Sequence, residues 1–293
     1  MTDRPGRRGW AWVRVGAGAA ILAVVVWRLG AGPFVAAARA VDAAALAAAL
    51  GIGVLTTVCC AWRWRAIAAG LGVTLPLGGA VAAYYRSQFL NATLPGGVVG
   101  DVHRAVRHGR DIGDLGLGVR AVLVERLAAQ PVHVGVAVVV LCVFPSPLRP
   151  YMPAVVLAVA AVALVTWLIM RRRGGPSRLS GRTWAGVTAA SAVVLLGHLA
   201  TFLVAARAVG ATAPLAQLIP LTLLALLAMA LPLNIAGWGP REGVAAWAFG
   251  AAGLTAAQGV TVAVTYGVLA LVACLPGAVV LMTWSARWGG PRE

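Results

Sequence analysis

The sequence predicts an all-α, polytopic integral membrane protein with about six to eight transmembrane helices. Hydrophobic residues make up 61% of the chain and charged residues only 11%, whereas the surface of a soluble domain requires a charged fraction of about one quarter. Apolar runs close to the roughly 20 residues that a helix needs to cross a bilayer recur along the chain. These observations exclude a soluble enzyme and place the function in the membrane.

The predicted spans follow the apolar runs in chain order. These runs cover residues 11–30, 41–61, 115–144, 151–170, 184–207, 214–232 and 256–284. The first run is too long for a cleavable signal and lacks a small-residue cleavage site, so we interpret it as a retained anchor. We predict one transmembrane domain over residues 1–293, with possible repeat halves at 41–144 and 184–284.

The segments between the spans predict the orientation. All 24 basic residues are arginine, and many of them gather in the separators 62–65, 103–110 and 171–182. Loops rich in basic residues stay in the cytoplasm, so both termini are predicted to be cytoplasmic in a bacterial-type plasma (inner) membrane. The formal net charge of +16 is spread over short loops and not gathered on one soluble face, which excludes nucleic-acid binding.

Two apolar stretches, 76–109 and 231–253, are broken by proline, glycine and charged residues. In the orientation above, the first stretch has too few residues for two full spans, so it should dip into the membrane and turn at "LPGG", residues 94–97. The second should turn at "GWGPREG", residues 237–243, and return to the outer face. We therefore predict two re-entrant hairpins that enter from opposite sides of the membrane.

The segments that follow the two predicted hairpins are alike. Asp101 lies as far ahead of Glu125 as Glu242 lies ahead of Tyr266. This spacing indicates a weak inverted repeat, the arrangement in which transporters bring broken helices together near the bilayer midplane. Non-helical backbone at that depth must be buried in protein or line a wet cavity, because lipid offers it no hydrogen bonds.

The second broken stretch has the features of an anion site. Pro240 is favoured at the first position of a helix, and the open amides after it, with the positive end of the helix dipole, attract a negative group. Arg241 would add a guanidinium. In the first stretch, Gly97 permits close approach of the backbone and Asp101 is a candidate N-cap. The alternative is that both are structural turns whose glycines only permit close helix packing.

Ionisable residues within the predicted spans are the other candidates, since each is costly in the membrane unless it is paired or hydrated. Arg126, Gln130 and His133 fall near one helical face. Arg241 and Glu242 are adjacent, so we expect them to point apart and to need other partners. The alternative is that the buried carboxylates pair with arginines only to hold helices together.

Two motifs resemble those of a known family. "FLNATLPGGVVGDVHR" (89–104), followed by the pair Glu125-Arg126, and "LPLNIAGWGPREG" (231–243) are similar to the paired motifs of the lysylphosphatidylglycerol synthase transmembrane-region family of flippase-like membrane proteins. The similarity extends from residue 62 to residue 277. It implies a set of functional positions: Asn91, Pro95, Gly97, Gly100, Asp101, Arg104, Glu125, Arg126, Gly237, Gly239, Arg241 and Glu242.

We assign one part of this set to substrate binding: Asn91, Gly97, Arg104, Glu125, Arg126, Gly239, Arg241 and Glu242. The other part, with Pro240 added, is assigned to structural turns: Pro95, Gly100, Asp101, Gly237 and Pro240. Two positions depart from the family pattern, since Val99 replaces a glycine and Gly267 stands where an arginine is common. The soluble aminoacyltransferase domain of bifunctional members is absent from this chain, so lysyl transfer is not expected.

The residues and the resemblance together predict a lipid flippase or transporter that binds an anionic, phospho- or polyprenyl-phosphate-linked head group between the two hairpins. Arginines would hold the phosphate, while Glu125 and Glu242 would orient the arginines or couple movement to protons. We expect no catalytic residue, no metal and no cofactor. The expected partner is a membrane lipid, with a lipid-modifying enzyme as a second possible partner.

Two alternatives come from other classes of protein. An intramembrane transferase acting on lipid-linked substrates would need a metal-binding carboxylate cluster, and Asp101, Asp111 and Asp114 are the group available; we interpret them as caps and loop charges. A non-transporting membrane partner of cell-envelope glycolipid synthesis would need the polar residues only for packing. In that case Arg241→Ala would damage folding and not function.

Overall fold

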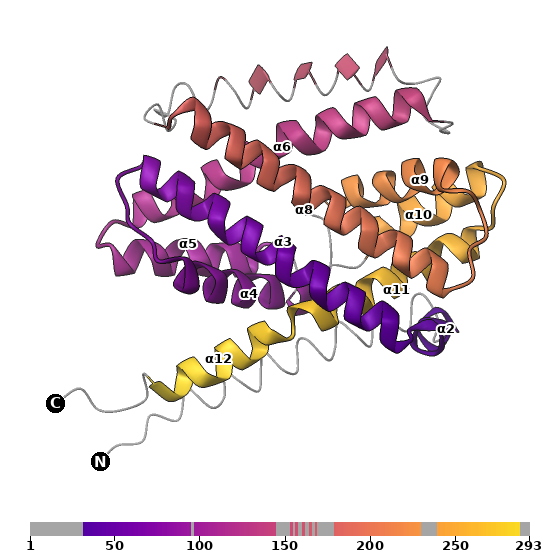
Figure 1. Ribbon diagram of the computed structural model, residues 1–293, viewed down its shortest axis with the longest axis horizontal. Coiled ribbons are helices and arrows are strands. Elements are labelled where there is room, and N and C mark those ends of the chain that lie inside the picture. Colours follow the sequence, from indigo (N-terminus) through magenta and orange to yellow (C-terminus); the bar gives the residue numbers. More distant parts are fainter. Residues whose placement is uncertain are drawn as a thin grey trace.

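The computed structural model describes residues 32–94, 97–144, 179–229 and 239–287, with isolated residues between 153 and 168. Every regular element that these residues form is an α-helix (Figure 1). The helices are α2 (Gly32–Ala40), α3 (Ala43–Gly70), α4 (Leu77–Thr93), α5 (Val99–Asp111), α6 (Leu115–Val143), α8 (Gly181–Ala208), α9 (Leu215–Ala228), α10 (Pro240–Ala251), α11 (Ala256–Cys274) and α12 (Pro276–Arg287). The expected spans at 11–30 and 151–170 lie wholly or mostly outside the described residues, as do Pro95 and Gly237.

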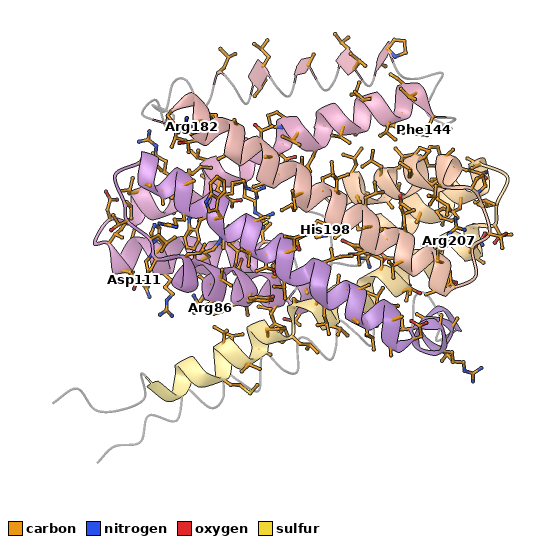
Figure 2. The ribbon with its side chains drawn as sticks, in the orientation of Figure 1. Arg86, Asp111, Phe144, Arg182, His198 and Arg207 are labelled. Atoms are coloured by element: carbon orange, nitrogen blue, oxygen red, sulfur yellow. The ribbon has the colours of Figure 1, made fainter. Side chains whose placement is uncertain are left out.

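Within this part of the chain, four segments are long and apolar enough to cross a membrane: α3, α6, α8 and Ala256–Met282. At 1.5 Å per residue each is roughly 40 Å long, which exceeds the hydrocarbon thickness of about 30 Å. Figure 2 shows α6 running lengthwise from the end near Asp111 to Phe144, and α8 from Arg182 to Arg207. The chain is therefore an all-α, multi-pass membrane protein, as its composition predicts.

Side-chain caps fix where the long helices begin. Asp42, Asp114, Ser180 and Thr255 each accept a hydrogen bond, at 2.7–3.1 Å, from the backbone amide three residues further on. Such a cap satisfies one of the amides that the first turn of a helix leaves open. The interpretation of Asp114 as a cap is confirmed.

The separator "WRWR", residues 62–65, was expected to be a loop, and this expectation is wrong. Helix α3 continues through it to Gly70, so that Arg63 and Trp64 are buried and Arg65 is exposed. No proline or glycine stands between Gly53 and Gly70, so nothing ends the helix at this separator. The buried charge of Arg63 has a carboxylate partner, described below. A buried arginine is tolerated in a membrane helix when it is paired in this way.

Two short helices, α5 and α10, are built into the fold in the same way. A turn with Gly113 at φ 74° connects α5 to α6, and a turn with Gly253 at φ 80° connects α10 to α11. Early in each following helix, a glycine packs against the backbone of the short helix. A Cβ added at Gly118 would lie 2.7 Å from a carbonyl oxygen of α5, and one at Gly259 would lie 2.3 Å from a carbonyl oxygen of α10. The two stretches with matched spacing thus share their turns and their packing.

The turn after α5 and the turn after α10 lie at opposite ends of the molecule. Asp111, the last residue of α5, lies at the same end as Arg182 (Figure 2). Ala252, directly after α10, accepts a hydrogen bond at 2.8 Å from the side chain of Gln217 in the first turn of α9. Helix α9 follows the Arg207 end of α8 after a short loop. The two hairpins therefore have opposite directions within the molecule.

The last apolar run, 256–284, is not one straight helix. Helix α11 ends at Cys274 and α12 begins at Pro276, because proline has no amide hydrogen with which to continue the helix. Figure 1 shows α12 leaving the body of the molecule at an angle. Gly277 allows this course, since a Cβ there would lie 2.2 Å from the carbonyl oxygen of Tyr85 in α4.

Gly100 brings α5 against α4. A Cβ added at this position would lie 2.0 Å from the carbonyl oxygen of Ser87, and this backbone atom cannot move aside as a flexible side chain could. Gly100→Ala is therefore expected to lower the free energy of unfolding by about 1–3 kcal/mol, measured by thermal unfolding in detergent. The control is Gly78→Ala in α4, where an added Cβ meets nothing within 4 Å. Equal effects of the two substitutions would contradict this role of Gly100.

Candidate functional site

Glu125 is the centre of a buried ion cluster. Its carboxylate, which is fully buried, accepts a hydrogen bond from Arg63 Nε to Oε1 at 2.8 Å and one from Arg104 Nη2 to Oε2 at 3.1 Å. Arg63 also donates through Nη1 to Ser191 Oγ of α8 at 3.1 Å. The Glu125 carboxylate therefore connects α3, α5 and α6, and Arg63 connects this group to α8. Arg63 is a member that the sequence analysis missed.

Asp101 is a second acceptor in the same cluster. Its carboxylate accepts hydrogen bonds from Ser87 Oγ at 3.2 Å, Asn91 Nδ2 at 3.0 Å and Arg104 Nη2 at 3.1 Å, and it forms an ion pair with Arg126. The expectation that Asp101 caps a helix is wrong, because α5 already begins at Val99 and Asp101 occupies its first turn. There the carboxylate faces the arginines and the polar side of α4, and Asn91 Oδ1 accepts from the Gly100 amide at 2.7 Å.

Arg104 is held between aromatic rings. Its guanidinium carbon lies 4.6 Å from the ring centroid of Trp64 and 4.0 Å from that of Tyr84, so the ring faces stabilise the charge. The side chain is only 1% exposed. With Arg63 and Arg126, it gives the cluster three guanidinium groups against the two carboxylates Asp101 and Glu125. The cluster therefore carries an excess positive charge.

The second hairpin carries its own ion pair. Arg241 Nε donates to Glu242 Oε1 at 2.9 Å, and Glu242 Oε2 accepts from the Gly239 amide at 2.7 Å. The expectation that these neighbours point apart is therefore wrong, whereas Arg241 does have other contacts, as expected. At the start of a helix there is no preceding turn, so the Glu242 side chain folds back over the first amide and the long Arg241 side chain reaches it. The Arg241 guanidinium carbon also lies 5.1 Å from the ring centroid of Tyr266.

A cavity of about 390 Å³ lies between the buried cluster that contains Arg126 and the Arg241–Glu242 pair. This volume is in the range of small-molecule sites. The cavity is lined by residues of α3, α4, α6, α8, α9, α10 and α11. Its polar wall includes Arg126, Gln130 and His133, which is the helical face that their spacing predicts, together with Arg241. Arg126, which follows the first broken stretch, and Arg241, which belongs to the second, therefore border one space.

The two arginines on this wall differ in exposure. The Arg126 side chain is 50% exposed, and apart from its bond to Asp101 its guanidinium has no hydrogen-bond partner among the described residues. The Arg241 side chain is only 4% exposed and is held by Glu242 and Tyr266. Arg126 can thus donate directly to a ligand, while Arg241 supplies positive charge from within the wall.

The structure brings some of the expected binding residues to the cavity and leaves others behind it. Those that line it are Asn91, Gly97, Arg126 and Arg241. Those that lie behind it, within the two ion clusters, are Arg104, Glu125, Gly239 and Glu242. Two of the turn residues, Gly100 and Pro240, lie at the starts of α5 and α10. Arg104 and the two glutamates therefore hold other residues in place and do not themselves face the cavity.

His198 and Tyr266 form a polar pair on another part of the wall. Tyr266 Oη and His198 Nδ1 lie 3.0 Å apart, and both residues line the cavity. His198 of α8 thus makes a hydrogen bond between helices, to α11. A single histidine in an apolar run carries no signal that it also borders a cavity.

The aspartates that a transferase would need do not form one group. Asp101 belongs to the arginine cluster and Asp114 caps α6. Asp111 forms an ion pair with Arg107, at 3.8 Å, on the surface of α5. Each of the three carboxylates thus has a separate structural partner.

This fold and site define a multi-pass helical membrane protein with a cavity between its helices that Arg126 and Arg241 line. A family model described as the lysylphosphatidylglycerol synthase TM region matches residues 11–277, so the chain belongs to this family. Comparisons with curated proteins and with solved structures found no match. Membership of the family associates the chain with lipid metabolism or transport in a membrane.

Proposed function

We propose that this protein binds the anionic head group of a membrane lipid in the central cavity and helps it to cross the bilayer. The observation that carries the proposal is that Arg126 of α6 and Arg241 of α10 lie on one cavity wall. A guanidinium binds phosphate through several hydrogen bonds at once. A phospholipid or polyprenyl-phosphate head group presents such a phosphate, and its chains would remain in the surrounding lipid.

The opposite directions of the two hairpins support a path across the membrane. In this proposal the chain lies in a bacterial-type plasma membrane with both termini in the cytoplasm, and α4–α5 and α9–α10 are re-entrant hairpins that form an inverted repeat over 41–144 and 184–284. The turns after α5 and α10 would then face opposite sides. A cysteine placed at the exposed position Leu115 should react with an impermeant reagent added on one side of the membrane only. A cysteine at the exposed position Ala257 should react only when the reagent is added on the other side.

The carboxylates have a supporting role in this proposal. Asp101 holds Arg126 and Glu242 holds Arg241, so these two carboxylates orient the guanidinium groups that line the cavity. Glu125 holds Arg63 and Arg104 behind the cavity wall. A fixed arginine loses less conformational freedom when a phosphate binds than a mobile one does. A lipid-modifying enzyme that supplies or removes the lipid is a second partner that this function could require.

The proposal is tested by lipid translocation in proteoliposomes. Acyl-labelled phosphatidylglycerol and a labelled polyprenyl-phosphate lipid would be compared in vesicles with the wild type, with the double variant Arg126→Ala, Arg241→Ala, and with no protein. The wild type is expected to speed the crossing of at least one lipid, and the double variant is expected to lose this effect.

Arg120→Ala provides the matched control for translocation. It removes an arginine from the same helix as Arg126, and Arg120 does not line the cavity. Equal crossing with and without folded wild-type protein, for every lipid, would contradict transport. It would favour the non-transporting partner or the transferase.

A further inference from the structure

We infer that His198 takes up a proton when the central cavity takes up its anionic ligand, so that the proton and the anion bind together. This inference rests on the proposed function, because it names the group through which the same cavity responds to pH. The observations that carry it are the hydrogen bond between His198 and Tyr266 and the ion pairs that hold the nearby carboxylates.

The carboxylates beside the cavity are poorly suited to take up a proton. Asp101 and Glu242 form ion pairs with the two arginines that line the cavity, and Glu125 is shared by two buried arginines behind the wall. A proton on any of these carboxylates would remove one side of an ion pair and leave an arginine without its counter-charge, which is costly. The carboxylates therefore stay charged when the pH changes near neutrality.

Two histidines line the cavity and can change charge without breaking an ion pair. His133 lies on α6 and His198 on α8. Histidine is the side chain whose charge changes between about pH 5 and about pH 8. His198 has a hydrogen-bond partner on the cavity wall, since its Nδ1 lies 3.0 Å from Tyr266 Oη of α11. Figure 2 shows His198 near the middle of the molecule, and the proton is assigned to this residue.

The groups around His198 do not give it a carboxylate of its own. The charged and titratable residues that line the cavity with it are Arg126 and His133 of α6, Arg241 of α10, and Tyr266 and Cys274 of α11. Helix α3 supplies Arg63, which is bonded to Ser191 about two turns before His198 and is matched by Glu125. Helix α9, which also packs against α8, contains no charged or titratable residue. Among the described residues, a protonated His198 therefore has no counter-charge of its own.

A bound anion supplies this counter-charge. Because a lone buried cation is costly, His198 is neutral while the cavity holds no anion. A phosphate in the same cavity offsets that cost, so the proton binds more tightly once the anion is present. By thermodynamic reciprocity the anion also binds more tightly once the proton is present. A proton gradient across the membrane therefore acts on the anion as well.

The hydrogen bond to Tyr266 passes the change on to the ligand. In neutral His198, Nδ1 either donates to Tyr266 Oη or accepts from it. In the protonated ring both nitrogens donate, so Tyr266 Oη accepts and its hydroxyl hydrogen is available to the cavity. The tyrosine ring is fixed by Phe202, on which it stacks with 4.8 Å between the ring centroids. An anion in the cavity thus gains a donor when His198 is protonated.

The test is isothermal titration calorimetry of phosphatidylglycerol binding to the purified full-length chain in detergent. The phosphodiester of this lipid does not change charge near neutral pH, so a proton taken up is bound by the protein. Titrations in two buffers with different ionisation enthalpies give the number of protons taken up per lipid. We expect about half a proton or more at about pH 7, and an affinity that falls by up to about tenfold per unit rise in pH. Binding without proton uptake, with equal affinity between about pH 5 and about pH 8, would overturn the inference.

His198→Gln removes the titratable ring and keeps an amide that can bond to Tyr266. This variant should bind the lipid without proton uptake and with an affinity that does not depend on pH. His133→Gln is the matched control, because it makes the same change at the other histidine of the cavity wall and should retain the uptake. Uptake that persists in folded His198→Gln, or that disappears in folded His133→Gln, would contradict the assignment.

Tyr266→Phe tests whether the hydroxyl passes the change on to the ligand. The variant keeps the stacked ring and removes Oη. Because the hydroxyl is available to the anion when His198 is protonated, the affinity should fall by about threefold to tenfold at about pH 5.5, the scale of one hydrogen bond, and change little at about pH 8. An equal loss at both pH values, which a purely structural role would give, would overturn this part of the inference.

Failure of the proton site can be told apart from failure of transport. Translocation in proteoliposomes at a rate independent of pH, together with binding without proton uptake, would retain transport and overturn the proton site. Proton uptake on lipid binding without translocation would retain the proton site and overturn transport. The absence of both binding and translocation for every anionic lipid would overturn both.

Discussion

Glu125→Gln is expected to lower the free energy of unfolding by about 3–5 kcal/mol, the cost of breaking a buried ion pair on one side only. The substitution keeps the size of the side chain but removes the negative charge that Arg63 and Arg104 share. Both guanidinium groups are almost fully buried, so water cannot replace the lost partner. Thermal unfolding of the purified protein in detergent, followed by tryptophan fluorescence, measures the effect.

Asp111→Asn is the matched control for this prediction. It removes a carboxylate from a pair at the surface, where Asp111 is two-thirds exposed and lies 3.8 Å from Arg107. Exposed pairs contribute about 1 kcal/mol or less. A loss of stability in Glu125→Gln no larger than that in Asp111→Asn would contradict the account of the buried cluster.

Arg126→Ala is expected to reduce binding of phosphatidylglycerol more than about tenfold, which is the scale for removing a charged contact to a ligand. Arg126 is the half-exposed cation on the cavity wall, and its guanidinium has N–H groups without a partner among the described residues, which a phosphate can take. Asp101 keeps Ser87, Asn91 and Arg104 as partners in the variant, so the protein should still fold. Arg126→Lys should restore part of the affinity, because it returns the charge without the planar guanidinium.

Arg120→Ala is again the control. It distinguishes an effect of the cavity on lipid binding from an effect of the overall charge of helix α6. Binding that falls equally in Arg120→Ala and Arg126→Ala would show that overall charge, and not the cavity, attracts the lipid. Unchanged binding in folded Arg126→Ala would contradict the role of this arginine directly. The ratio of the phosphatidylglycerol affinities of the two variants is therefore the quantity to report.

Much of the fold follows from local features of the sequence. The long apolar runs predict the helices that cross the membrane, since a spanning segment must satisfy its backbone internally. Gly113 and Gly253 mark the turns because only a residue without a Cβ adopts their left-handed backbone easily. The spacing from Asp101 to Glu125 equals the spacing from Glu242 to Tyr266. In the structure the first member of each pair lies in a short helix, α5 or α10, and the second lies in the long helix that follows.

The interior of the site follows less directly from the sequence. Arg63 and its partner Glu125 are 62 residues apart, and nothing in "WRWR" distinguishes a buried arginine from a loop arginine. The pairing of Arg241 with its neighbour depends on its place at the very start of α10. The cavity itself arises where several helices fail to fill the space between them, and periodicity within one helix does not encode such a gap.

The central claim is that the two halves of the chain bind one head group in one cavity. It is tested most directly by photolabelling the purified protein with a phosphatidylglycerol that carries a diazirine on its head group, followed by mass spectrometry of the peptides. The account predicts labels on α6 near Gln130 and on α11 near Tyr266, both lost in Arg126→Ala. Labels on one half only, or only on the exposed outer surface of α6 near Val139, would contradict it.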